Sequence, residues 1–324
     1  MIRQNFNADW TVEKGDGNSR MNSFLGNTQT KTVHLPYDAM IHEARTPDTK
    51  NGAQTGFYPG GEYIFQKHFT APQAWQGKPV SLVFEGVYQT ALVYLNGWLL
   101  TRNVNGYAEF TVEAGPYLKY GADNLLKVIA DNSLEPNSRW YTGSGIYRPV
   151  RLLVGNKVYL PQDTVRITTR EADEGFALLD VTAQVQSAST VTERVTLQQT
   201  ICREGTAVLT DRQNLLLQPG ESRTVSFRYC VDSPALWSPE NPNLYTSTMQ
   251  VLEGEEELDR EETGFGIRTL SIDAAHGVRI NGQTVKLRGA CIHHDNGILG
   301  ACGFADAEER RIRIMKKAGY NAVR

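Results

Sequence analysis

The chain has 324 residues, of which 40% are apolar and 21% charged, a composition typical of globular proteins with two or three domains. Its net charge of −3 gives no electrostatic reason to expect nucleic acid or an anionic membrane as a partner. No run approaches the roughly 18 apolar residues of a spanning helix, and the start, MIRQNFNADW, lacks the charged and then apolar pattern of a secretory signal. We therefore expect a cytoplasmic protein.

The cysteines do not form a pattern typical of a disulfide framework or a zinc site. They are Cys202, Cys230, Cys291 and Cys302. None belongs to a CxxC pair, and four thiols in a chain of this length fit a reducing compartment. The last two flank the pair His293-His294, but the spacing matches no standard zinc pattern. We predict no metal centre from these residues.

Residues 1–155 predict a β-sandwich or jelly roll, because short apolar runs alternate with connections rich in Gly and Asn. Asn96-Gly97 stands between two apolar runs, as in a type I′ hairpin whose two turn residues both take positive φ. The stretch TPDTKNGAQTGFYPGG (46–61) has the composition of a long loop. We assign Trp10, Trp98 and Trp237 to the hydrophobic cores.

Residues 156–268 predict a second, immunoglobulin-like sandwich. In LLDVTAQVQ (178–186) and SRTVSFRYCV (222–231) apolar and polar residues alternate strictly, so one strand face is buried and the other is wet. The acidic run EGEEELDREE (253–262) is typical of a solvated hairpin. Cys202 and Cys230 are too close in sequence for the usual bridge between the two sheets of such a domain.

In residues 269–324 the spacing of apolar residues differs from that of the preceding strands. VKLRGACI (285–292) predicts a strand, and a loop then leads to a helix that Asp306 would cap. Gly319 stands where a left-handed helix stop belongs. Tyr320 then begins another strand. This β-loop-α-β order is the opening unit of a parallel α/β domain.

Five motifs in this order resemble glycoside hydrolase family 2, which contains β-galactosidases, β-glucuronidases and β-mannosidases. They are NSRWYTGSGIYRPVRLLV (137–154), ALWSPENPNLYTSTMQV (235–251), GFGIRTL (264–270), NGQTVKLRGACIHHD (281–295) and MKKAGYNAVR (315–324). The resemblance covers nearly the whole chain. The HHD of residues 293–295 is closer to the β-galactosidase-like members than to the glucuronidases, which usually carry His-Glu-Asp there.

The resemblance implies a jelly-roll domain (1–155), an immunoglobulin-like domain (156–268) and the start of a (β/α)₈ barrel (269–324). It also implies the N-terminal part of a retaining β-glycosidase that hydrolyses terminal β-linked sugars, with β-galactosides first and β-glucuronides or β-mannosides as alternatives. Such enzymes use two Glu residues, an acid/base and a nucleophile, about 5–5.5 Å apart. In the family both lie on later barrel strands, so we expect no catalytic residue in this chain and no activity from it alone.

Five residues are candidates for sugar binding by resemblance. His293 matches a family position that contacts the sugar, and Asp295 would accept hydroxyl hydrogens, unless this loop only caps the barrel. Arg324 matches an Arg that lies beside the nucleophile, where a cation keeps a carboxylate ionised. Arg139 and Trp140 lie on a loop that reaches the active site in relatives, although Trp140 could instead pack at a domain interface.

The resemblance also bears on partners. It implies a carbohydrate substrate and no required cofactor, with Mg²⁺ or Na⁺ known near the pocket in some members. We expect neither nucleic acid nor membrane as a partner, and association into a homo-oligomer stays open. The rival hypothesis is a non-catalytic β-sandwich module that binds carbohydrate or a protein. A half-built barrel unit at residues 269–324 argues against that rival.

Overall fold

The computed structural model describes residues 1–15, 30–134, 137 and 141–324. Its strands form six sheets, and α2 (Ala305–Lys317) is the one α-helix in these ranges, so the prediction of a mainly β chain with several sheets is confirmed. The chain divides into two compact units. The first unit comprises residues 2–154 and 292–317, and the second comprises Met1, 155–291 and 318–324.

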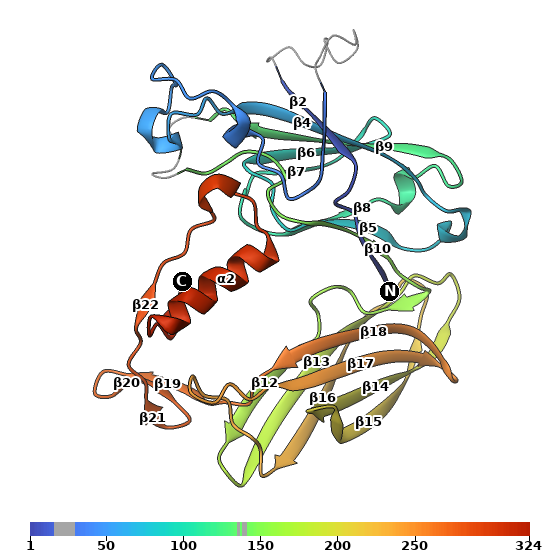
Figure 1. The fold of residues 1–324 in the computed structure, drawn as a ribbon. Helices are drawn as coiled ribbons and strands as arrows, with labels where there is room; N and C mark the ends of the chain where they lie inside the picture. Colours follow the sequence, from blue (N-terminus) through green and yellow to red (C-terminus); the bar gives the residue numbers. More distant parts are fainter. Residues whose placement is uncertain (16–29, 135–136, 138–140) are drawn as a thin grey trace. The chain divides into compact units, whose positions relative to one another are not determined.

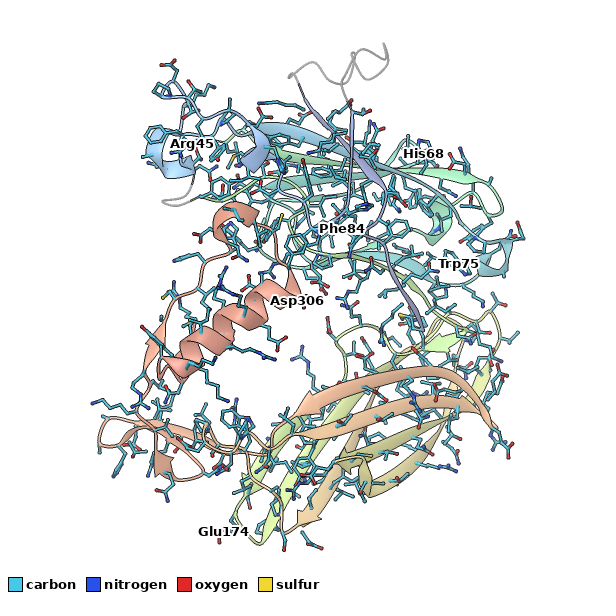
Figure 2. The ribbon with its side chains drawn as sticks, in the orientation of Figure 1. Arg45, His68, Trp75, Phe84, Glu174 and Asp306 are labelled. Carbon is cyan, nitrogen blue, oxygen red and sulfur yellow. The ribbon has the colours of Figure 1, made fainter. Side chains whose placement is uncertain are left out.

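The first unit contains two antiparallel sheets that share one core (Figure 1). One sheet has the order β1 (Ile2–Asn5), β10 (Val150–Val154), β5 (Val80–Phe84), β8 (Phe110–Glu113). The other has the order β3 (Lys31–Val33), β2 (Trp10–Lys14), β4 (Gly61–Thr70), β9 (Asp123–Asn132), β6 (Thr90–Leu95), β7 (Trp98–Asn103). Trp10, Phe65 and Phe84, the last labelled in Figure 2, are fully buried in this core.

Short 3-10 helices interrupt the connections. They are η1 (Met40–His42), η2 (Gly52–Thr55), η3 (Gln73–Trp75), η4 (Gly115–Tyr117) and η5 (Gly297–Leu299). The predicted long loop 46–61 therefore contains η2 and ends as β4 begins. No helix in the described ranges has the length and apolar character needed to cross a bilayer.

The hairpin β6–β7 confirms the predicted tight turn, because Asn96 has φ 52° and Gly97 has φ 89°. The assignment of all three tryptophans to the cores is only partly right. Trp10 is fully buried and Trp237 half-buried beside the Arg268 guanidinium. Trp98, however, is 65% exposed. It directly follows the two turn residues, so it lies at the end of the hairpin rather than above the core.

The second unit contains another pair of sheets around a core of its own. In one sheet, β13 (Phe176–Ser187) pairs with β11 (Val158–Tyr159), β12 (Arg166–Ala172) and β16 (Ser222–Asp232). The other has the order β15 (Thr206–Leu217), β14 (Glu193–Arg203), β17 (Tyr245–Glu253), β18 (Glu256–Phe265). The predicted alternation is confirmed in β13 and β16, where every second residue from Leu179 to Val185 and from Val225 to Val231 is buried.

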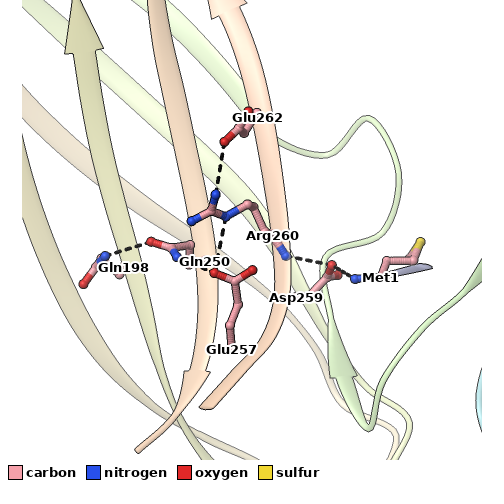
Figure 3. A network of polar contacts seen from close by, with 7 residues as sticks. All are labelled: Met1, Gln198, Gln250, Glu257, Asp259, Arg260 and Glu262. Atoms are coloured by element: carbon pink, nitrogen blue, oxygen red, sulfur yellow. Dashed lines mark hydrogen bonds and ion pairs between the residues drawn. The ribbon is translucent and has the colours of Figure 1, made fainter. Parts of the chain in front are cut away.

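The acidic run forms the turn and first part of the β17–β18 hairpin, as predicted, but it is not wholly solvated. Asp259 is almost completely buried. It accepts hydrogen bonds from the Met1 ammonium and the Arg260 backbone N–H (Figure 3). On the outer side, Gln250 accepts a hydrogen bond from Gln198 and donates one to Glu257 (Figure 3). The buried Asp259 therefore ties the start of the chain to this sheet.

The segment after residue 268 starts with a small antiparallel sheet of β19 (Leu270–Asp273), β20 (Gly277–Ile280) and β21 (Gln283–Thr284). β22 (Gly289–Ala290) and β23 (Ala322–Val323) then pair in parallel, as the β-loop-α-β pattern predicts. Both are shorter than predicted. α2 begins one residue before the expected cap, so Asp306, labelled in Figure 2, lies in its first turn. Gly319 has φ 86°, which confirms the left-handed stop.

Candidate functional site

The segment 292–304, which carries the HHD sequence, is bound to the sandwich of the first unit by hydrogen bonds. His294 Nε2 donates to the Thr142 carbonyl oxygen at 2.7 Å. The Ala301 N–H donates to Asp38 Oδ2 at 2.9 Å, and the Gly303 N–H donates to the Tyr147 carbonyl oxygen at 2.8 Å. The loop therefore has a fixed position against residues more than 150 positions earlier in the chain.

Asp38 is the centre of this attachment. Its carboxyl group is fully buried and accepts four hydrogen bonds. Oδ1 accepts from the N–H groups of Met40 and Ser144, both at 3.0 Å, and Oδ2 accepts from Ala301 N–H and from the Tyr141 hydroxyl at 2.6 Å. A buried carboxyl group needs such partners, because leaving its oxygens unsatisfied would cost several kcal/mol. Asp38 thus joins three separate parts of the chain.

His294 lies among three tyrosine rings. Its ring centroid is 5.2 Å from that of Tyr107, 5.6 Å from that of Tyr147 and 6.1 Å from that of Tyr88. Burial lowers the pKa of His294 below its usual value, although the hydrogen bond to Thr142 acts in the opposite direction. A neutral imidazole that donates to a backbone carbonyl suits a residue that anchors the loop.

Arg311 on α2 holds the backbone on both sides of His294. Its guanidinium donates to the carbonyl oxygen of His293 at 3.0 Å and to that of Asp295 at 3.1 Å. Glu308, one turn earlier, lies 3.5 Å from the same guanidinium. The helix therefore fixes the main chain of the two candidate residues, while the Asp295 side chain stays exposed.

A pocket of about 420 Å³ adjoins this loop. Its lining includes Glu85 and Arg148 from the sandwich, and His293, His294 and Glu308. The volume lies near the lower end of the range for small-molecule sites, about 300–1,000 Å³. Carboxylates accept and guanidinium groups donate hydrogen bonds, and imidazole can do either, so the lining suits a ligand rich in hydroxyl groups.

The structure brings only some of the predicted site residues together. His293 and Asp295 lie on one loop of the first unit. Arg324 belongs to the second unit, where its N–H donates to the Ala290 carbonyl oxygen beside β22. Arg139 and Trp140 lie outside the described residues, so their predicted role stays a prediction.

Sequence reasoning missed Asp38 and Arg311. Asp38 lies among apolar and small residues in LPYDAMI (35–41), which is an unusual setting for an acidic residue. This setting is the feature of the sequence that could have indicated a buried carboxyl group. No feature of the sequence indicated Arg311, because it is one of several basic residues on a helix and its hydrogen-bond acceptors are backbone oxygens. A side chain on Gly143 would collide with Asp38, so the close approach of these two segments requires a glycine at this position.

Among the described residues, no group of three or more His, Cys, Asp or Glu side chains is placed to hold a metal ion. All four cysteines are free. Burial raises the pKa of Cys302 to about 11, so its thiol stays protonated at neutral pH.

Sequence comparison identifies the family. The family described as "Glycosyl hydrolases family 2" matches residues 158–268, and its "Glycosyl hydrolase 2 galactose-binding domain-like" region matches residues 10–176. The second match alone spans more than half of the chain. The chain belongs to glycosyl hydrolase family 2.

Individual relatives carry two different enzyme names. A protein named beta-galactosidase BoGH2A from Bacteroides ovatus is 35% identical over 99% of this chain, which corresponds to 38% of the relative. A putative beta-glucuronidase from Formosa agariphila is 30% identical over 100% of this chain and 30% of the relative. The chain therefore spans well under half the length of these relatives.

A solved structure gives the same result. The crystal structure of a glycosyl hydrolase family 2 member from Bacteroides cellulosilyticus superimposes with a TM-score of 0.93 at 33% identity. The match covers 100% of this chain and 42% of that protein. The mainly β architecture with several sheets is thus that of the N-terminal β domains of the family.

Proposed function

We propose that this chain is the N-terminal part of a retaining β-glycosidase that hydrolyses terminal β-linked sugars, with β-galactosides as the first substrate class to test. The observation that carries the proposal is the 35% identity to a protein named beta-galactosidase over 99% of the chain. β-Glucuronides are the second class, because other relatives are named beta-glucuronidases. β-Mannosides remain an alternative from the family resemblance alone.

The proposed architecture is a jelly roll over residues 1–155, an immunoglobulin-like sandwich over 156–268 and the start of a (β/α)₈ barrel at 269–324. The parallel pair β22–β23 with α2 between its strands in sequence supports the barrel assignment. A parallel pair needs helices or further strands on both faces, which two strands of two residues cannot supply. The acid/base and nucleophile Glu would come from later barrel strands.

In this proposal the chain supplies part of the sugar pocket. His293 and Asp295 would hydrogen-bond sugar hydroxyls at the end of the first barrel strand, where active sites of such barrels lie. Arg324 would keep the nucleophile Glu ionised. Arg139 and Trp140 would approach the sugar from the first domain. Asp38, His294 and Arg311 would act as positioning residues, because they hold the loop backbone and need not touch the sugar.

The test compares the 324-residue protein with the protein encoded by the full reading frame, which we expect to continue past Arg324. Aryl β-galactoside, β-glucuronide and β-mannoside are assayed with both. We expect turnover of one of them by the longer protein and none by the 324-residue protein. Turnover by the pure short protein, or a longer protein inert on all three, would contradict the proposal.

The same longer protein tests the role of His293. We expect His293→Ala to lower kcat/KM roughly 100-fold, because misplaced sugar hydroxyls spoil alignment of the reacting bond. The control is His68→Ala, since His68 is an exposed residue of β4 in the same unit. Equal kcat/KM values for the two variants would show that His293 does not belong to the sugar-binding site.

A further inference from the structure

Strand β15 is a long exposed edge of the second unit (Figure 1). It pairs with β14 on one side and with no other strand in the described ranges. Most of its twelve residues are exposed, among them Val208 at 45% and Leu216 at 54%. The Arg212 N–H uses the carboxylate of the neighbouring Asp211 as its acceptor, at 2.8 Å. Such an edge presents a row of backbone N–H and C=O groups with which another strand can pair.

The other edge strands of the two large sheets in this unit carry features that oppose pairing between copies. Charge, proline and bulges are the usual ones. β18 has five acidic residues and one arginine, β16 has two arginines and one aspartate, and β12 has a bulge between Thr169 and Glu171. β15 has one aspartate and one arginine, so its net charge is zero, and it contains no proline, glycine or lysine. Its pairing with β14 is regular from Leu209 to Leu217.

The sequence of β15 is complementary to a second copy of itself in one register. Residues directly opposite each other in an antiparallel pair share one face of the sheet, so a twofold axis must pass through a residue position. An axis at Asp211 or Arg212 would set like charges opposite each other, which is destabilising. An axis nearer the start of the strand would include the irregular pairing at Val208. An axis at Gln213 pairs every residue from Leu209 to Leu217 and sets no like charges opposite each other.

A row of side-chain hydrogen bonds crosses the sheet and ends at this edge. Gln198 on β14 donates to Gln250 on β17 at 2.8 Å (Figure 3). Arg212 on β15 donates from Nε to Gln198 at 2.6 Å. The two terminal nitrogens of the Arg212 guanidinium have no partner within the described residues. In the register given above, Arg212 lies opposite Asn214 of the second copy, whose side-chain oxygen can accept. The row of hydrogen bonds would therefore continue into the second copy.

We propose that two copies of this chain associate through β15, which pairs antiparallel with its twofold-related copy around Gln213. The pairing joins two four-stranded sheets into one sheet of eight strands. The two Gln213 side chains face each other at the axis, where each amide can both donate and accept a hydrogen bond. A single strand pair is a small interface, so the dimer belongs to the weak class whose population depends on concentration. The inference rests on the strand edge and not on the proposed enzymatic activity.

The test is sedimentation equilibrium of the 324-residue protein over a concentration series that reaches the millimolar range. We expect the average mass to rise from that of a monomer toward that of a dimer. Gln213→Lys and Gln213→Glu each set like charges opposite each other at the axis, so each should weaken the dimer roughly tenfold. An equimolar mixture of the two variants places opposite charges there and should dimerise at least as well as wild type. Gln213 is exposed, so both variants should fold normally, which urea unfolding checks.

The matched control is Thr168→Lys, which adds the same charge at an exposed position of β12, an edge of the other sheet, and should leave dimerisation unchanged. The proposal is overturned if wild type stays monomeric throughout the series, because a second copy then does not occupy the edge. It is also overturned if Gln213→Lys dimerises like wild type, which would place the contact on another surface. A mixture of the two folded variants that stays monomeric would contradict the pairing around Gln213.

Discussion

Asp38 shows how one side chain can decide where a distant loop lies. Its four donors come from residues 40, 141, 144 and 301, so the last of them is 263 positions away. No sequence pattern encodes such a partner, which is why the sequence predicted His293 and Asp295 as a loop but not what holds them. The motif GSG (143–145) was visible, yet its close approach to Asp38 depends on tertiary structure.

Asp38→Asn tests this attachment. An amide NH₂ would replace one oxygen and face N–H or O–H donors, so we expect the first unit to lose about 3 kcal/mol of unfolding free energy. Urea unfolding measures the loss. Asp48→Asn is the control, because Asp48 is exposed in the loop 46–61 and should change stability by less than about 0.5 kcal/mol. Equal effects of the two substitutions would contradict the role of Asp38.

His294 makes the unfolding free energy of the first unit depend on pH, and the sign of this dependence follows from the lowered pKa of His294. The unfolded chain binds a proton below about pH 6.5, while the folded protein resists it. The stabilising contribution is therefore complete above pH 6.5 and is lost as the pH falls toward the folded-state pKa. In His294→Phe, which keeps a ring among the three tyrosines, this loss should be absent.

The measurement is the free energy of unfolding of both proteins at pH 7.5 and at pH 5. We expect wild type to be more stable than His294→Phe at pH 7.5, by about 1 kcal/mol for the lost bond to Thr142, and the difference to narrow at pH 5. His68→Gln, which removes a histidine on the exposed side of β4, is the control. A difference that is the same at both pH values would show that His294 is not held neutral.

At the scale of elements, predictions from local rules were the accurate ones. The alternation of apolar and polar residues predicted the buried faces of β13 and β16, and the Asn-Gly sequence predicted the β6–β7 turn. The same turn rule could not tell that Trp98 would be exposed, because exposure depends on how far a hairpin extends past the core. β22 and β23 are shorter than predicted. The predicted lengths came from the hydrophobic runs in the sequence, whereas the observed lengths depend on how many residues pair between the two strands.

The turn η5 offers a matched pair of glycines. Gly300 has φ 62°, and a Cβ there would overlap Asp38, whereas Gly297 has φ 55° and no atom within 4 Å of a Cβ. We expect Gly297→Ala to cost about 1 kcal/mol from the left-handed backbone alone. Gly300→Ala should cost about 3 kcal/mol or more, because its φ of 62° and ψ of −131° lie outside the left-handed helical region and the collision with Asp38 adds to that backbone strain. Urea unfolding measures the loss of unfolding free energy in both variants. Equal losses would mean that the loop does not lie against Asp38 in solution.

At the scale of the whole molecule, two separate cores should produce two unfolding transitions. One core lies around Trp10, Phe65 and Phe84, and the other around Leu197, Met249 and Val251. Each is large enough to unfold cooperatively by itself. We expect two peaks in calorimetry, of which Asp38→Asn shifts only one. A single peak whose calorimetric and van't Hoff enthalpies agree would show that the units unfold together.

The division of the chain into these units has a consequence for how its domains can be exchanged or inherited. Residues 292–317 belong to the first unit, although β22 and β23 on either side of them belong to the second. A gene fragment that stops at residue 155 would encode Asp38 without the Ala301 N–H, which is one of its four donors. Recombination at that boundary would thus remove a hydrogen bond from a buried carboxyl group, and the first sandwich should travel through evolution together with residues 292–317 rather than as an independent module.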